Sequence, residues 1–201
     1  VSENILKDIN NKVKNYPWHE MPEDGGWKYG TNLEYMKEIS NYWVTKFNWK
    51  KHEEKINKFS NFKTDVDGLN IHYILEKGSG LKPTPLLLMH GWPGSVLEFL
   101  HIIEKLAHPE KFGGKEEDAF DVVVPSLPGF GFSGSPSRPI GPRKMSEIIN
   151  KLMINNLGYK NYVAQGGDWG ATICNWLAYD HFKTCKAIHI NCLTMRLPDG
   201  P

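Results

Sequence analysis

The chain has 201 residues, of which 40% are hydrophobic and 23% are charged, as in an ordinary globular protein. Its net charge of +1 gives no electrostatic reason to expect nucleic acid or an anionic membrane as a partner. No apolar run reaches the roughly 20 residues of a membrane span, so we expect a soluble, cytoplasmic chain without a transmembrane segment. The alternative of an N-terminal membrane anchor removed before Val1 stays open. Three cysteines without a Cys-x-x-Cys pair fit a reducing compartment and predict neither a disulfide framework nor a metal centre.

The first 60 residues predict a mainly helical region. Apolar residues recur at helical spacing over 5–13. Thr31 or Asn32 can cap a second helix that runs to about residue 46, and a third helical piece is expected over 49–58. We therefore expect two domains, an N-terminal region at 1–60 and a core at 61–201.

The core begins with a hairpin and continues as alternating strands and helices. Asp67-Gly68 is a two-residue turn signal between two runs of alternating polarity. The expected buried strands are 86–89, 120–124, 162–165 and 187–190, and the expected helices are 95–107, 142–157 and one that starts near Gly170. This alternation predicts an α/β fold with a mostly parallel sheet flanked by helices, whose active site lies at the carboxyl ends of the strands.

The stretch over 163–172 indicates a strand, a tight turn and a helix around one carboxylate. Gly166 lies two residues before Asp168 and Gly170 lies two residues after it, which is the Gly-x-nucleophile-x-Gly spacing with aspartate in place of serine. A carboxylate that attacks an alkyl carbon forms an ester, which water can cleave, whereas a serine would form a stable ether. Asp168 therefore favours chemistry on an epoxide or an alkyl halide. A bare turn is the alternative for these residues alone.

Two further motifs follow predicted strands and belong to the same edge of the sheet. His-Gly-Trp-Pro-Gly occupies 90–94, after the strand at 86–89. Pro-Ser-Leu-Pro-Gly-Phe-Gly-Phe-Ser occupies 125–133, after the strand at 120–124. Asp121, at the start of that strand, is expected to occupy a solvated or capping position. No phosphate-binding loop or dinucleotide fingerprint is present, so we expect no cofactor.

These three motifs resemble the consecutive signatures of epoxide hydrolases with the α/β-hydrolase fold. The segment at 22–30, with the aromatic residues at 42–43 and 47–51, is similar to the N-terminal region of the microsomal and juvenile-hormone branch. The resemblance covers nearly the whole chain in matching order and spacing. It implies a small apolar epoxide as substrate, a vicinal diol as product, and a role in detoxification.

The resemblance also implies a role for each motif residue. Asp168 matches the nucleophile that forms the alkyl-enzyme ester, and the backbone N–H groups of Trp92 and Trp169 match the oxyanion hole. The supporting motif residues are His90, Gly91, Pro93, Gly167 and Gly170. In this family pattern His90 is structural rather than the catalytic base, and Pro93 fixes the turn, with a cis bond in relatives.

The family's charge-relay histidine, its acidic partner and its two lid tyrosines match no position in this sequence. The C-terminal part of the fold is therefore expected to be absent from this chain, with activity of the chain alone impaired. Three explanations stay open: the sequence is the N-terminal piece of a longer enzyme, a completing chain or a homo-oligomer supplies the missing groups, or the chain is a degenerate relic. Two other functions stay open: a non-catalytic module that binds a lipid or a protein partner, and a haloalkane dehalogenase-like hydrolase, which also uses an elbow aspartate.

Overall fold

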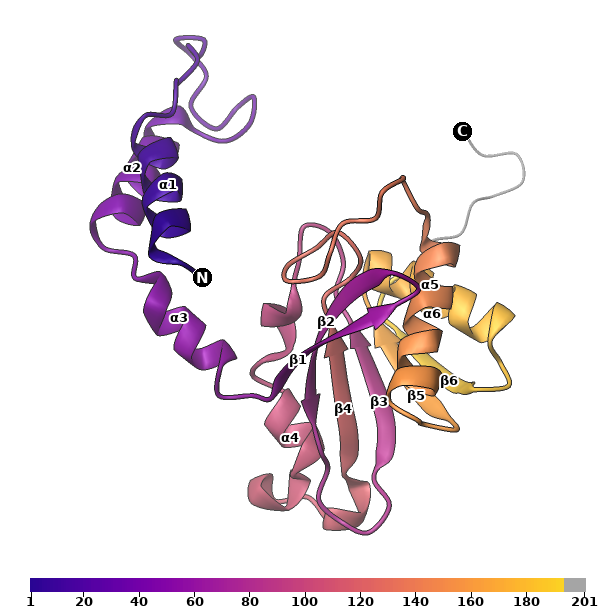
Figure 1. The fold of residues 1–201 in the computed structure, drawn as a ribbon. Helices are drawn as coiled ribbons and strands as arrows, with labels where there is room; N and C mark the ends of the chain where they lie inside the picture. The colour runs from indigo at the N-terminus through magenta and orange to yellow at the C-terminus, as the bar shows by residue number, and fades with distance from the viewer. Residues whose placement is uncertain (194–201) are drawn as a thin grey trace. The chain divides into compact units, whose positions relative to one another are not determined.

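The computed structural model describes residues 1–193, and the chain divides into two compact units, Val1–Lys55 and a second unit that starts at Ile56. The helices that carry the first unit are α1 (Glu3–Lys14), α2 (Leu33–Thr45) and α3 (Trp49–Ile56), drawn in indigo to violet in Figure 1. Ser2 caps α1, and the Asn32 Oδ1 accepts a hydrogen bond of 3.0 Å from the Tyr35 amide at the start of α2. Helices α1 and α2 pack on each other, yet neither contains a buried residue.

The second unit is built on one sheet (Figure 1). Within residues 1–193 its strands are β1 (Asn61–Val66), β2 (Leu69–Glu76), β3 (Thr84–Met89), β4 (Phe120–Pro125), β5 (Tyr162–Gly166) and β6 (Cys185–Ile190). Their order across the sheet is β1-β2-β4-β3-β5-β6. The pairs β1–β2 and β2–β4 are antiparallel, and the pairs β3–β4, β3–β5 and β5–β6 are parallel. The predicted α/β fold with a mostly parallel sheet is confirmed.

Asp67 and Gly68 form the tight turn between β1 and β2. Asp67 has φ 54° and Gly68 has φ 80°, so both adopt the left-handed conformation that a two-residue hairpin turn requires. The Gly68 amide donates a hydrogen bond of 2.9 Å to the Asp65 carboxylate, which closes the turn. The predicted hairpin is therefore present.

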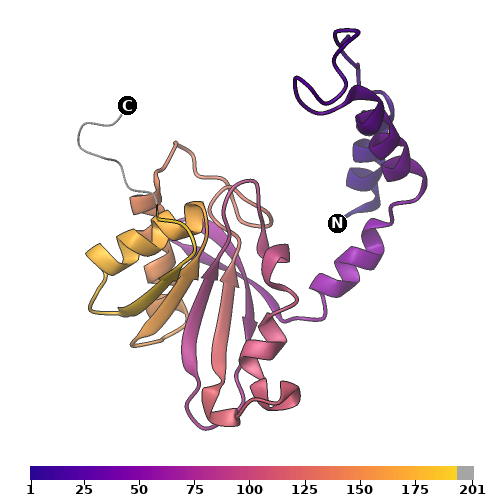
Figure 2. The same cartoon turned by 180° about the vertical axis from the view of Figure 1, so that it is seen from behind.

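Helices cover both faces of the sheet, as the two opposite views in Figures 1 and 2 show. Leu87 and Met89 of β3 point to one face, where they pack with residues of α5 (Pro142–Lys151) and α6 (Trp169–Asp180). Leu86 and Leu88 point to the other face, toward α4 (Ile103–Ala107). Each fully buried leucine stabilises the fold by about 2 kcal/mol through loss of apolar surface from water. This sandwiched sheet is a rigid support for the loops at its carboxyl edge.

The single helix predicted over 95–107 is wrong. The chain forms a 3₁₀ helix, η1 (Val96–Phe99), and then the short α4. Val96 and Phe99 are both buried, and their spacing of three suits the three residues per turn of a 3₁₀ helix. The other short helices are η2 (Pro109–Phe112), η3 (Glu116–Asp118) and a π-helical turn, η4 (Leu152–Asn156), which completes the helix predicted over 142–157.

Of the two positions expected for Asp121, solvated or capping, the solvated one is wrong. Its carboxylate is buried at the start of β4, where Lys77 Nζ lies 2.7 Å from Oδ2 and the Tyr159 hydroxyl donates to the same oxygen at 2.9 Å. The Gly78 amide donates to Oδ1 at 2.9 Å. These partners come from distant parts of the chain, so the sequence pattern around Asp121 did not indicate them.

Candidate active site

The elbow around Asp168 is a sharp turn between β5 and α6. Asp168 has φ 50° and ψ −122°, a conformation that residues with a side chain rarely adopt. A Cβ on Gly166 would collide with the backbone of Gly170, and a Cβ on Gly170 would collide with the Met89 carbonyl. Both glycines are required because α6 begins too close to the backbones of β5 and β3 to leave room for a side chain.

The His-Gly-Trp-Pro loop after β3 reaches across to the elbow. The Trp92 amide donates a hydrogen bond of 2.8 Å to Oδ1 of Asp168. A Cβ on Gly91 would overlap the Asp168 carboxylate, so the loop approaches the side chain as closely as glycine permits. The Trp92–Pro93 peptide bond is cis, as the resemblance predicted. The structure thus brings together the two motifs whose residues were expected to share a site.

Hydrogen bonds hold the Asp168 carboxyl group in its charged form. The amide of Trp92, and then that of Trp169, lower the pKa of Asp168 below its ordinary value. Asp168 also precedes the first turn of α6, whose positive end favours a negative charge there. The side chain is exposed, so the carboxylate is both ionised and accessible.

His90 lies below this loop and is fully buried. Its Nε2 accepts a hydrogen bond of 3.0 Å from the Leu127 amide, and its Nδ1 donates to the Gly91 carbonyl at 2.9 Å. Burial lowers the pKa of His90, so the ring is neutral near pH 7. Both ring nitrogens are engaged by backbone, which connects the 90–94 loop to the 125–133 loop and leaves no nitrogen to act as a base.

The 125–133 loop is fastened by a buried polar network that the sequence did not indicate. The Ser126 hydroxyl donates to His72 Nδ1 at 2.9 Å, and His72 Nε2 donates to Asn61 Oδ1 at 2.9 Å. Ser133 Oγ donates to the Ser126 carbonyl at 2.7 Å and accepts from the His72 amide at 2.9 Å. Burial lowers the pKa of His72 to about 4. The network connects β1 and β2 to the loop after β4.

The Asp168 carboxylate faces a shallow hollow of about 380 Å³. The lining residues are Gly91, Trp92, Pro93, Gly94, Glu98, Gly167, Asp168 and Asn191. Two of these were missed from the sequence, Glu98 and Asn191. Asn191 follows β6 directly and could have been found by the rule that sites form at strand ends. Across residues 1–193 no group of three or more His, Cys, Asp or Glu side chains is placed to hold a metal ion.

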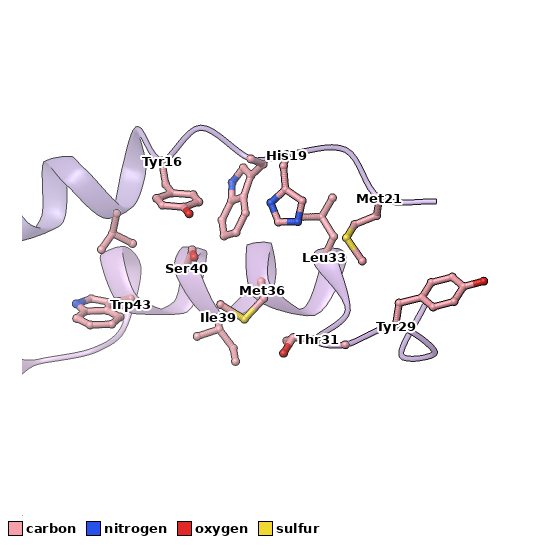
Figure 3. Close-up of a pocket in the computed structure, with 13 residues that line it drawn as sticks. Tyr16, His19, Met21, Tyr29, Thr31, Leu33, Met36, Ile39, Ser40 and Trp43 are labelled. Carbon is pink, nitrogen blue, oxygen red and sulfur yellow. The ribbon is translucent and has the colours of Figure 1, made fainter. Parts of the chain in front are cut away.

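A larger hollow of about 620 Å³ lies within the first unit. Figure 3 shows its walls, formed by the chain around Tyr16, His19 and Met21 on one side and by α2 residues such as Met36 and Trp43 on the other. Its lining includes one imidazole and no carboxylate or thiol. The carboxylate of the elbow motif lines the other hollow, the one around Asp168. In the part of the chain that the structure describes, no helix is long and apolar enough to span a bilayer.

A carboxylate raised on a strand–turn–helix elbow, at the carboxyl edge of a mostly parallel sheet, defines a hydrolase-type site. Residues 84–199 match the family model described as "alpha/beta hydrolase fold", and residues 1–99 match the one described as "Epoxide hydrolase N terminus". The chain belongs to the α/β-hydrolase fold family. Within that family it resembles the microsomal and juvenile-hormone branch of epoxide hydrolases, as its motifs predicted.

Individual relatives agree with this assignment. Epoxide hydrolase 1 of Sus scrofa is 37% identical over 195 residues, which cover 94% of this chain and 43% of that protein. Juvenile hormone epoxide hydrolase 1 of Ctenocephalides felis is 37% identical over 205 residues, which cover 96% of this chain and 43% of that protein. The chain thus spans less than half the length of the curated relatives it matches.

Solved structures show the same fold. The Aspergillus niger epoxide hydrolase matches with a TM-score of 0.86 and 30% identity, over 100% of this chain and 53% of that one. The juvenile hormone epoxide hydrolase of the silkworm Bombyx mori matches with a TM-score of 0.82 and 33% identity, over 95% of this chain and 50% of that one.

Proposed function

We propose that this chain serves epoxide hydrolysis, in which an epoxide and water give a vicinal diol through an ester on Asp168. The observation that carries the proposal is the Asp168 carboxylate itself, which is exposed on a strained elbow with Oδ1 held by the Trp92 amide at 2.8 Å. The names of the relatives point to the same reaction. The substrate that we propose is a small apolar epoxide.

The hydrogen bond to Oδ1 assigns separate roles to the two carboxylate oxygens. With Oδ1 held, Oδ2 is the atom that attacks a ring carbon of the epoxide. A bond forms between Oδ2 and that carbon while the carbon–oxygen bond of the ring breaks, and its electron pair stays on the departing oxygen, which takes a proton from water. The product is a hydroxyalkyl ester of Asp168.

The Trp92 amide also serves the second step, which is hydrolysis of the ester. Water attacks Cγ of the ester, and negative charge develops on Oδ1, which already accepts from the Trp92 amide. A donor placed in advance at such an oxygen stabilises the transition state by about 3 kcal/mol. The water loses a proton to a base, the bond from Cγ to Oδ2 breaks, and Oδ2 takes that proton and leaves as a hydroxyl group of the diol. Asp168 keeps Oδ1 and the oxygen of the water, and its remaining proton passes to solvent.

The second step requires a base, and this requirement limits the rate at which the chain can release the diol. The ionisable side chains that line the described hollow are Asp168 and Glu98, and His90 is engaged by backbone on both nitrogens. We therefore propose that the chain alone is alkylated once and releases the diol slowly. A completing chain or a second copy is the proposed source of the remaining groups, and the cytoplasm is the proposed location.

Mass spectrometry of the intact chain after incubation with styrene oxide tests the proposal. We expect a mass increase equal to one epoxide, located on Asp168 by peptide mapping, and no such adduct on the Asp168→Asn protein. Asp118→Asn, which changes an exposed aspartate in η3, is the matched control and should react like the unmodified chain.

Four outcomes would contradict the proposal. An unmodified chain that forms no adduct has no reactive nucleophile, and an Asp168→Asn protein that forms the adduct at the original rate reacts elsewhere. Chloride release from 1-chlorobutane that is faster than styrene oxide addition would favour a dehalogenase. Binding of styrene oxide without reaction, unchanged by Asp168→Ala, would favour a non-catalytic module.

A further inference from the structure

Asn191 stands beside the elbow on the side opposite the oxyanion loop. It follows the last residue of β6, and β6 pairs in parallel with β5 so that Ile190 lies opposite Gly166. The strand order β3-β5-β6 places the turn with Asp168 between the loop after β3, which contains Trp92, and the residue after β6. Asn191 therefore flanks the turn with Asp168 on the side of β6.

The carboxamide of Asn191 lies directly over the elbow backbone. A Cβ built on Gly167 would be 2.7 Å from Asn191 Oδ1 and 3.0 Å from Nδ2. Gly167 does not have a positive φ, so a side chain there would meet the Asn191 carboxamide rather than backbone strain. The same distances place a side chain with two N–H donors and one acceptor next to the residue that precedes Asp168.

Asn191 and Asp168 line the same hollow. The Trp92 amide already donates to Oδ1 of Asp168 at 2.8 Å, so it is occupied when the epoxide ring opens. The oxygen that leaves the attacked carbon gains negative charge and needs a donor of its own. A neutral carboxamide supplies that donor without competing with Asp168 for the role of nucleophile.

We propose that Asn191 contacts the substrate and donates a hydrogen bond from Nδ2 to the epoxide oxygen as the ring opens. The inference rests on the proposed function and adds a substrate contact to it. Asn191 keeps its proton throughout; the departing oxygen receives the electron pair of the broken carbon–oxygen bond and a proton from water. The same contact holds the hydroxyl group of the resulting ester.

The test compares two alkylating reagents on the full chain. Styrene oxide leaves a charged oxygen attached to the substrate, whereas 1-iodobutane releases iodide, which is a poor hydrogen-bond acceptor. We expect Asn191→Ala and Asn191→Asp to lower the maximal rate of Asp168 alkylation by styrene oxide about tenfold, with little change in the concentration for half-maximal rate. For Asn191→Ala, alkylation by 1-iodobutane should stay within about twofold of the unmodified chain.

Asn191→Gln should recover part of the rate with styrene oxide because it restores a carboxamide. Asn155→Ala, which changes an exposed asparagine in η4, should leave both rates unchanged. An Asn191→Ala protein that reacts with styrene oxide at the original rate overturns the inference. Equal slowing with both reagents also overturns it, because Asn191 would then only support the elbow. If the unmodified chain forms no adduct at all, the proposed function itself has failed, and this result is distinct from a failure of the inference about Asn191.

Discussion

The Cα of Gly91 and the carboxylate of Asp168 lie so close that a Cβ on Gly91 would overlap the Asp168 side chain. The two residues are 77 positions apart in the sequence, and the parallel pairing of β3 with β5 brings their loops together. Because the Trp92 amide that follows Gly91 binds Oδ1, the loop position sets the orientation of the carboxylate.

Gly91→Ala should therefore displace the Asp168 carboxylate. We expect the rate of Asp168 alkylation by styrene oxide to fall about 100-fold, since a shift on the order of 1 Å at a reacting group has that effect. Gly141→Ala is the control, because a Cβ there meets nothing within 4 Å. Alkylation kinetics followed by intact-mass measurement check the prediction. An unchanged rate in Gly91→Ala would show that the loop does not orient the nucleophile.

The alkylation step should be independent of pH across the neutral range. The amides of Trp92 and Trp169 lower the pKa of Asp168 from its ordinary value of 3.8, so the anion persists from neutral pH down past that value. Protonation should slow alkylation only below about pH 4. Single-turnover rates measured from about pH 4 to 8 check this. A fall in rate between about pH 7 and 6 would instead indicate that a histidine takes part in this step.

His90→Ala should destabilise the fold rather than alter the chemistry. The substitution removes a buried ring and leaves the Leu127 amide and the Gly91 carbonyl without their partner. We expect a loss of about 3 kcal/mol, which lowers the thermal midpoint by roughly 10 °C. His101→Ala, at an exposed position, is the control and should leave the midpoint unchanged. A normal midpoint combined with lost alkylation would reassign His90 to the reaction.

Acid should destabilise the chain through His72. Its pKa is about 4 in the folded chain and 6.5 when exposed, so the unfolded chain binds the proton first as the pH falls. The contribution of neutral His72 to stability is present above pH 6.5 and is lost progressively toward about pH 4; the loss is about 2 kcal/mol at about pH 5. Urea unfolding at about pH 7 and 5 measures it.

His72→Gln should make this part of the acid response disappear, since glutamine does not titrate. The comparison is made with His101→Gln, which changes an exposed histidine and should retain the original difference between the two pH values. Equal losses in His72→Gln and in the unmodified chain would mean that His72 is not the group that takes up the proton.

Local sequence was sufficient to predict the turns and the position of the candidate nucleophile. Asp67-Gly68 and the glycines around Asp168 act through steric limits on the backbone within a few residues, and such limits do not depend on the rest of the fold. The strands were predictable from their length, because apolar runs of four or five residues between turn signals are too short for a helix. Asp168 and the motif loop of Trp92 could thus be placed at one edge from the sequence.

The side chains that surround Asp121 and Gly167 were decided by the tertiary structure alone. Lys77 and Tyr159 meet Asp121, and Asn191 reaches Gly167, because of the order in which strands pair across the sheet. Neighbours across parallel strands are separated by whole crossover connections, so no local pattern records their contact. The sequence by itself indicated the candidate nucleophile, its turn and, through the family resemblance, the two amides beside it; only the assembled sheet decided which side chains line the hollow at Asp168 and which groups surround Asp121.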